Sequence, residues 1–115
     1  MTAVNECLFC RIVAGDIPAT VVHETERTLA FRDISPKAPV HVLVITKEHY
    51  ADVAALGSGD PALAGEVIAS VATVAEKEGL LGDGFRVVFN TGESVGQTVL
   101  HAHAHVLGGR SYGDL

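Results

Sequence analysis

The segment from His101 to Leu107 constrains the fold more than any other part of this 115-residue chain. It reads His-Ala-His-Ala-His-Val-Leu, so imidazole side chains alternate with small or apolar ones. Successive side chains of a β-strand point to opposite faces, which places the three histidines on one face and Ala102, Ala104 and Val106 on the other. We therefore predict a strand whose small side chains face the core.

Three interpretations of these histidines follow from their spacing. A single metal ion bound by all three is disfavoured, because His101 and His105 lie roughly 13 Å apart along an extended strand at about 3.3 Å per residue; a pair two residues apart can still share an ion. A solvated, tag-like run is also disfavoured, because apolar residues separate the histidines and the strand pattern begins at Val99. The third interpretation is an anion-binding site with a histidine nucleophile.

The rest of the chain is patterned as an α+β domain. A short N-terminal helix carrying Leu8, Phe9, Ile12 and Val13 is expected to stop at the turn 15–18. A long helix is expected between Asp60, as its N-cap, and Gly79, as its stop signal. The expected strands are 20–24, 28–32, 41–46, 85–90 and 100–107. Residues 1–115 contain no repeat or linker, so we predict one domain with an antiparallel sheet of about five strands covered by the long helix.

Charge and hydropathy exclude several classes of partner. The formal net charge is −6 with neutral histidines, which gives no general attraction to nucleic acid or to anionic lipid. The longest apolar run, residues 42–45, is far shorter than the roughly 20 residues that span a bilayer, and the N-terminus has no signal-peptide pattern. We expect a cytoplasmic protein that binds neither nucleic acid nor membranes.

Two separated blocks resemble the histidine-triad (HIT) superfamily, in particular its Hint branch. The first block is residues 96–110, Gly-Gln-Thr-Val-Leu-His-Ala-His-Ala-His-Val-Leu-Gly-Gly-Arg. The second comprises residues 30–41 and 44–49, Ala-Phe-Arg-Asp-Ile-Ser-Pro-Lys-Ala-Pro-Val-His and Val-Ile-Thr-Lys-Glu-His. The resemblance covers nearly the whole chain and implies a single HIT domain that pairs into a homodimer. The apolar face of residues 63–75 and the strand 85–90 also leave more apolar surface than a chain of this length easily covers.

The resemblance implies an enzyme that acts at the α-phosphate of purine nucleoside phosphoramidates. His103 would attack the phosphorus atom and form a transient nucleotidyl-histidine. His105 would donate hydrogen bonds to the non-bridging oxygens, and the Thr98 hydroxyl would lie near the leaving group. His41 matches the fourth histidine of the family, which is expected to be a hydrogen-bond partner beside the triad. The alternatives are hydrolysis of dinucleoside polyphosphates, and a nucleotide-binding regulatory module whose turnover is incidental.

The nucleotide-binding residues implied by the resemblance come from both blocks and from the N-terminal helix. Asp33 would accept hydrogen bonds from the ribose hydroxyls, and Asn90 with the turn 91–96 would supply an amide and backbone N–H groups to the phosphate. The full expected set is Leu8, Phe9, Phe31, Asp33, Ile34, Asn90, Gly96, Gln97, Thr98, His103 and His105, of which Leu8, Phe9, Phe31 and Ile34 would surround the base.

Cys7 and Cys10 are the two cysteines of the chain and form a Cys-x-x-Cys pattern. Without a secretion signal a structural disulfide is disfavoured; a redox dithiol and half of a metal site stay open. The resemblance implies that His49 and His101 complete a structural zinc site, as in many bacterial relatives. His23 has no matching role and is expected to be a solvated strand residue.

Overall fold

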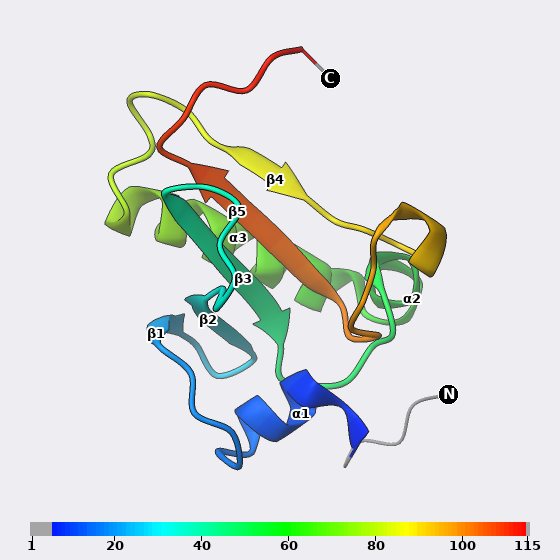
Figure 1. Ribbon diagram of the computed structural model, residues 1–115. Coiled ribbons are helices and arrows are strands. Elements are labelled where there is room, and N and C mark those ends of the chain that lie inside the picture. Colours follow the sequence, from blue (N-terminus) through cyan, green and yellow to red (C-terminus); the bar gives the residue numbers. More distant parts are fainter. Residues whose placement is uncertain (1–5, 115) are drawn as a thin grey trace.

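The computed structural model describes residues 6–114, which form one five-stranded antiparallel sheet with helices on both of its faces (Figure 1). The strand order is β1-β2-β3-β5-β4. The strands are β1 Val21–Glu24, β2 Thr28–Arg32, β3 Val40–Thr46, β4 Arg86–Val88 and β5 His103–Gly108. The histidine strand β5 therefore lies between β3 and β4, and the short strand β4 is at the edge of the sheet.

Two of the three α-helices match the predicted elements. They are α1 Leu8–Val13 and α3 Pro61–Lys77, and α3 begins as predicted, since the Asp60 carboxylate accepts a hydrogen bond from the Leu63 backbone N–H at 3.0 Å. The helix α2 Val53–Gly59 was not predicted, because its two glycines weaken the helical pattern. Its first turn is stabilised by Asp52, which caps the Ala55 N–H at 2.8 Å.

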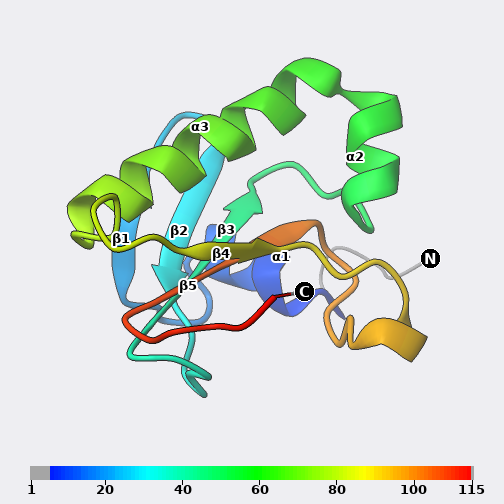
Figure 2. The ribbon, with the colours of Figure 1, turned by 90° about the horizontal axis from the view of Figure 1, so that it is seen from above.

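Each face of the sheet has its own core (Figure 2). Val42, Val44 and Ala104 point toward α3 and pack with its apolar side chains. Leu43 and Ile45, which alternate with them along β3, point toward α1 instead. Because both faces of β3 are covered, its apolar residues form a continuous run. The histidines of β5 lie on the α1 face, since His103 pairs with Ile45 and His105 with Leu43.

The structure corrects two predicted strands. The strand expected over residues 100–107 begins only at His103, because the Ala102 N–H donates to the Tyr50 carbonyl at 2.7 Å, past the end of β3, instead of pairing with β3. His101 instead lies in a tight turn, in which its N–H donates to the Val99 carbonyl at 2.9 Å. The strand expected over residues 85–90 is limited to Arg86–Val88.

The helix face over residues 63–75 leaves less apolar surface exposed than the sequence analysis expects. Leu63, Val67, Val71 and Val74 are all buried against the sheet of the same chain. Two of the large apolar side chains that stay exposed belong to the segments expected to leave surplus surface, Ile68 of α3 and Phe85 of the strand expected over 85–90, whereas Ile34 and Leu81 lie elsewhere. No helix within residues 6–114 is both long enough and apolar enough to cross a bilayer.

Candidate functional site

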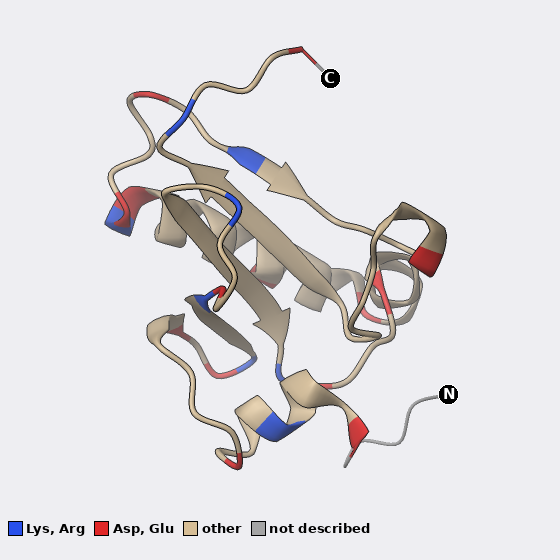
Figure 3. Cartoon of the chain, in the orientation of Figure 1, with Lys and Arg blue, Asp and Glu red and all other residues tan. Residues whose placement is uncertain are grey.

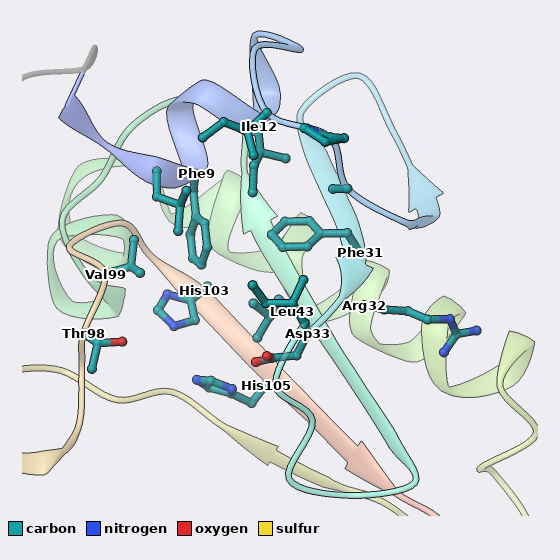
Figure 4. Close-up of a pocket in the computed structure, with 15 residues that line it drawn as sticks. Phe9, Ile12, Phe31, Arg32, Asp33, Leu43, Thr98, Val99, His103 and His105 are labelled. Carbon is teal, nitrogen blue, oxygen red and sulfur yellow. The ribbon is translucent and has the colours of Figure 1, made fainter.

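A cavity of about 240 Å³ opens on the α1 face of the sheet (Figure 4). Residues from α1, from the end of β2, and from the segment leading into β5 surround it. They are Leu8, Phe9, Ile12, Ile17, Pro18, Ala19, Phe31, Arg32, Asp33, Ile34, Leu43, Thr98, Val99, His103 and His105. Most of this lining is apolar, and the polar groups gather on one side, where the two histidines, Asp33 and Thr98 lie.

His103 is held in one defined protonation pattern. Its Nδ1 lies 2.6 Å from the carbonyl oxygen of His101, and because a carbonyl can only accept, Nδ1 carries the proton. The other nitrogen, Nε2, therefore keeps its lone pair. Burial lowers the pKa of His103 below its usual value, against smaller opposing effects of this hydrogen bond and of Asp33. The ring of Phe9 packs edge-on against the imidazole, with centroids 5.0 Å apart. A neutral, oriented imidazole of this kind is suited to nucleophilic attack.

A chain of hydrogen bonds determines which nitrogen of His105 carries its proton. The backbone N–H of Lys37 donates to His41 Nδ1 at 3.0 Å, so the proton of neutral His41 is on Nε2. That Nε2–H lies 2.9 Å from His105 Nδ1, which therefore accepts. His105 is left with a proton on Nε2. The arrangement makes His105 Nε2 a hydrogen-bond donor, as anion binding by this residue requires.

Asp33 is the one carboxylate that lines the cavity among the described residues. One of its oxygens accepts the Ser35 N–H at 2.7 Å, which closes a turn after β2. The other lies 3.5 Å from His41 Nε2. Asp33 is thus held toward the histidines, with part of its surface still open to the cavity.

The structure brings together most of the residues that the sequence analysis assigned to nucleotide binding. Eight of them line the cavity: Leu8, Phe9, Phe31, Asp33, Ile34, Thr98, His103 and His105. Phe9 and Phe31 meet edge to face with centroids 5.6 Å apart and form one apolar side. The sequence analysis missed other apolar lining residues, including Ile12, Leu43 and Val99. Ile12 follows Leu8 at helical spacing, which is a signal that it shares a face with that residue.

Three residues assigned to nucleotide binding, Asn90, Gly96 and Gln97, do not line the cavity. The buried Gln97 amide bonds to its own loop and to the segment between β3 and α2: its Nε2 donates to the carbonyls of Val99 and Ala51 at 3.1 and 2.7 Å. Its Oε1 accepts the Gly92 N–H at 2.9 Å. Gln97 therefore holds the loop that presents Thr98 to the cavity.

Cys7, Cys10, His49 and His101 converge beside the cavity. His101 Nδ1 lies 3.3 Å from Cys7 Sγ, 3.5 Å from Cys10 Sγ and 3.2 Å from His49 Nδ1. Cys10 Sγ lies 3.2 Å from His49 Nδ1. For zinc with bonds of about 2.0–2.3 Å, the edges of a ligand tetrahedron are about 3.3–3.8 Å. The four side chains are therefore close enough to bind one metal ion.

The chemistry of the donors also suits a metal. His101 Nε2 donates to the Thr46 carbonyl at 2.6 Å, so Nδ1 keeps its lone pair and faces the cysteines. Burial, followed by the neighbouring Cys7, raises the pKa of the Cys10 thiol to about 11, and a bound cation would favour its thiolate form. A second group of potential ligands, Asp33, His41 and His105, fits a cation poorly, because His41 directs an N–H at this group.

Comparisons with known proteins agree with this geometry. The family model described as HIT domain matches residues 14–112. An uncharacterized HIT-like protein of Synechococcus elongatus is 45% identical over 107 residues, which cover 93% of each chain. The purine nucleoside phosphoramidase of Escherichia coli K12 is 38% identical over 111 residues, covering 96% of this chain and 93% of the relative. A HIT family hydrolase from Clostridium thermocellum superposes with a TM-score of 0.93 at 39% identity, with 98% of each chain covered.

Proposed function

This chain belongs to the HIT family, and from that premise we propose that it is a hydrolase of purine nucleoside phosphoramidates that works through a nucleotidyl-histidine. The observation that carries the proposal is the orientation of His103. Its Nδ1–H is bound to the His101 carbonyl, and its imidazole lines a cavity whose opposite side is apolar. The resemblance of this chain to the phosphoramidase of Escherichia coli supports the substrate class.

The proposed reaction has two displacements at the α-phosphorus. In the first, His103 Nε2 forms a bond to phosphorus while the phosphorus–nitrogen bond to the amine breaks, and the leaving nitrogen takes up a proton from solvent and departs as a neutral amine. The Thr98 hydroxyl lies on the leaving-group side. In the second, water attacks the phosphorus, loses a proton and releases the nucleoside monophosphate with free His103. His105 Nε2–H donates to a non-bridging oxygen in both steps.

The remaining polar and apolar groups of the cavity account for nucleotide recognition. The Asp33 carboxylate would accept hydrogen bonds from the ribose hydroxyls, and the base would lie between α1 and β2, against Phe9 and Phe31. Aromatic edges and aliphatic side chains offer a base a dry surface without specific donors. This lining supports binding of a nucleoside. Any preference for one purine base over another would depend on individual contacts with that base.

Steady-state hydrolysis of adenosine phosphoramidate, compared with diadenosine triphosphate, tests the proposal. We expect kcat/KM to favour the phosphoramidate. A preference for the diadenosine compound would support the dinucleoside polyphosphate hydrolase instead. Tight binding of AMP without turnover of either compound would support the regulatory module.

We also propose that the cluster of Cys7, Cys10, His49 and His101 holds one structural zinc ion. Two thiolates and two neutral imidazoles complete a closed tetrahedral set, which leaves no position for substrate. When bound, zinc would supply a cross-link between the N-terminal segment and the sheet. Cys7 and Cys10 flank Leu8 and Phe9, so this cross-link would also hold one side of the nucleotide cavity in place.

A homodimer is the assembly that we propose. Strand β4 is at the edge of the sheet, and its outer side presents backbone groups that another strand can pair with. Leu81 and Phe85, which precede β4, are exposed to 58% and 38%. A two-fold axis beside β4 would bring two copies of this apolar edge together.

A further inference from the structure

A second cavity, of about 290 Å³, lies beside the edge strand β4. It lies where β4 begins and β5 has ended, and its lining comes from residues 83–86 and 110–112. Arg86, in this lining, pairs with Leu107, two residues beyond His105, but no residue lines both cavities. The proposed catalytic reaction does not use it.

Two guanidinium groups gather in this cavity around one aromatic ring. The Arg86 guanidinium lies 4.8 Å from the centroid of the Tyr112 ring, and that of Arg110 lies 4.9 Å from it. The two charges are therefore no more than about 10 Å apart, within one Debye length at physiological salt. Figure 3 shows these two basic segments next to each other in a chain whose net charge is −6.

No carboxylate within residues 6–114 neutralises this pair of charges. The ion pairs of the described chain involve Arg27, Arg32, Lys47 and His41, but neither Arg86 nor Arg110. Asp83 lines the same cavity without forming an ion pair with either arginine. Two like charges brought this close repel each other, and a bound anion would remove that cost.

The guanidinium groups are also positioned rather than free. Arg86 Nη2 donates to the Gly113 carbonyl at 2.7 Å, which leaves its other N–H groups available. Arg110 is exposed, and its Nε donates weakly to the Ser111 carbonyl at 3.4 Å, so both of its terminal nitrogens are available. Stacking on Tyr112 restrains both groups further. The Ser111 hydroxyl supplies another donor in the lining.

We propose that this cavity, formed by Arg86, Arg110, Ser111 and Tyr112, binds a phosphate-type oxyanion. Guanidinium donors can bind phosphate or carboxylate, and the double negative charge of phosphate would balance the two positive charges of Arg86 and Arg110. The volume exceeds that of a phosphate ion alone, so a phosphomonoester also fits. The site is independent of the proposed catalytic reaction, because no residue of the catalytic cavity contributes to it, although Phe85 of its lining also belongs to the proposed dimer edge.

Titration of ¹⁵N-labelled protein with inorganic phosphate tests the proposal, with sodium chloride at matched ionic strength as the control. We expect saturable shifts of the backbone amides of residues 84–86 and 110–113. These are distinct from any shifts at Asp33, Thr98 and His103, which report phosphate in the catalytic cavity. Shifts confined to the catalytic cavity, or equal shifts with chloride, would overturn the proposal.

Matched variants identify the donors. Because Arg110 is exposed, Arg110→Gln should fold normally, and we expect it to weaken phosphate binding at least about tenfold through loss of charge-assisted hydrogen bonds. Arg11→Gln removes the same charge from the exposed surface of α1 and should leave the affinity unchanged. Equal affinities of the two variants would contradict the site. An acetate affinity equal to that for phosphate would contradict the assignment to phosphate-type anions.

Discussion

The carbonyl oxygen of His101 accepts the Nδ1–H of His103 at 2.6 Å, while the imidazole of His101 faces Cys7 and Cys10. One residue therefore belongs to both the candidate metal cluster and the candidate catalytic site. Its side chain orients itself by donating to the Thr46 carbonyl, and its backbone orients the nucleophile. Any change that displaces the turn at His101 is expected to affect His103 directly, without a longer path of contacts.

Replacement of the nucleophile should abolish turnover but not nucleotide binding. For His103→Asn we expect kcat to fall by about 10⁴-fold or more, because covalent catalysis has no substitute at this position. The affinity for AMP should change little, since Asp33, Phe9 and Phe31 remain. His23→Asn, on β1 and outside the cavity, is the control and should keep wild-type turnover. Retention of more than a tenth of the activity by His103→Asn would exclude His103 as the nucleophile.

Removal of the Asp33 carboxylate should act mainly on recognition of the ribose. We expect Asp33→Ala to raise KM for ribonucleotide substrates, with a loss of roughly 1–3 kcal/mol in transition-state or ground-state binding. A 2′,3′-dideoxy substrate should be nearly insensitive to the substitution. Any effect that remains on that substrate measures the contact of Asp33 with His41, which is 3.5 Å away. Equal losses on both substrates would assign Asp33 a structural role alone.

The candidate metal site predicts one zinc ion per chain in the purified protein. Elemental analysis should find near-stoichiometric zinc, and Cys7→Ser should lose it and lower the melting temperature, because the link between the N-terminal segment and the sheet is lost. His103→Ala should retain zinc. A protein free of zinc whose melting temperature is unchanged by a chelator would show that the cysteines are an ordinary reduced pair.

Stability should fall as the pH is lowered from about 6.5 toward 4. Burial, followed by the neighbouring His103 and His41, lowers the pKa of His105 to about 4, while the unfolded chain titrates near 6.5. Between these values the unfolded state binds more protons, so the free energy of unfolding decreases by up to about 1.4 kcal/mol per pH unit for this group. Urea midpoints at several pH values in wild type and His105→Asn measure the effect. The variant should have the smaller slope, and identical slopes would contradict the assignment.

The free edge of β4 predicts a dimer in solution. Sedimentation at micromolar concentration should give twice the 12.0 kDa mass of the chain. The physical reason is that pairing of the two edges would satisfy backbone groups and cover Leu81 and Phe85. A monomer under these conditions would refute the proposed assembly.

Local sequence patterns were sufficient to predict the elements that depend on residues close together in the sequence. The Asp60 cap and the apolar spacing after it predicted α3, and the alternation around His103 predicted which side chains face the core. The same patterns misplaced the start of β5 and missed α2. Where a strand begins depends on where its partner ends, and α2 forms despite Gly57 and Gly59 because its capping and packing compensate for low helix propensity.

By itself, the sequence determined the histidine face of β5 and the Cys-x-x-Cys pair. Through its resemblance to a family, it also named the residues expected at the catalytic, nucleotide-binding and metal sites. Only the tertiary structure decided which atoms meet. The pairing of β3 with β5 brings His41 within 2.9 Å of His105, and the turn before β5 brings His101 to the cysteines. A periodic pattern specifies an element and its buried face, but contacts between residues distant in sequence depend on strand register and loop path. Those same factors place Arg86 beside Arg110, which no local pattern indicates.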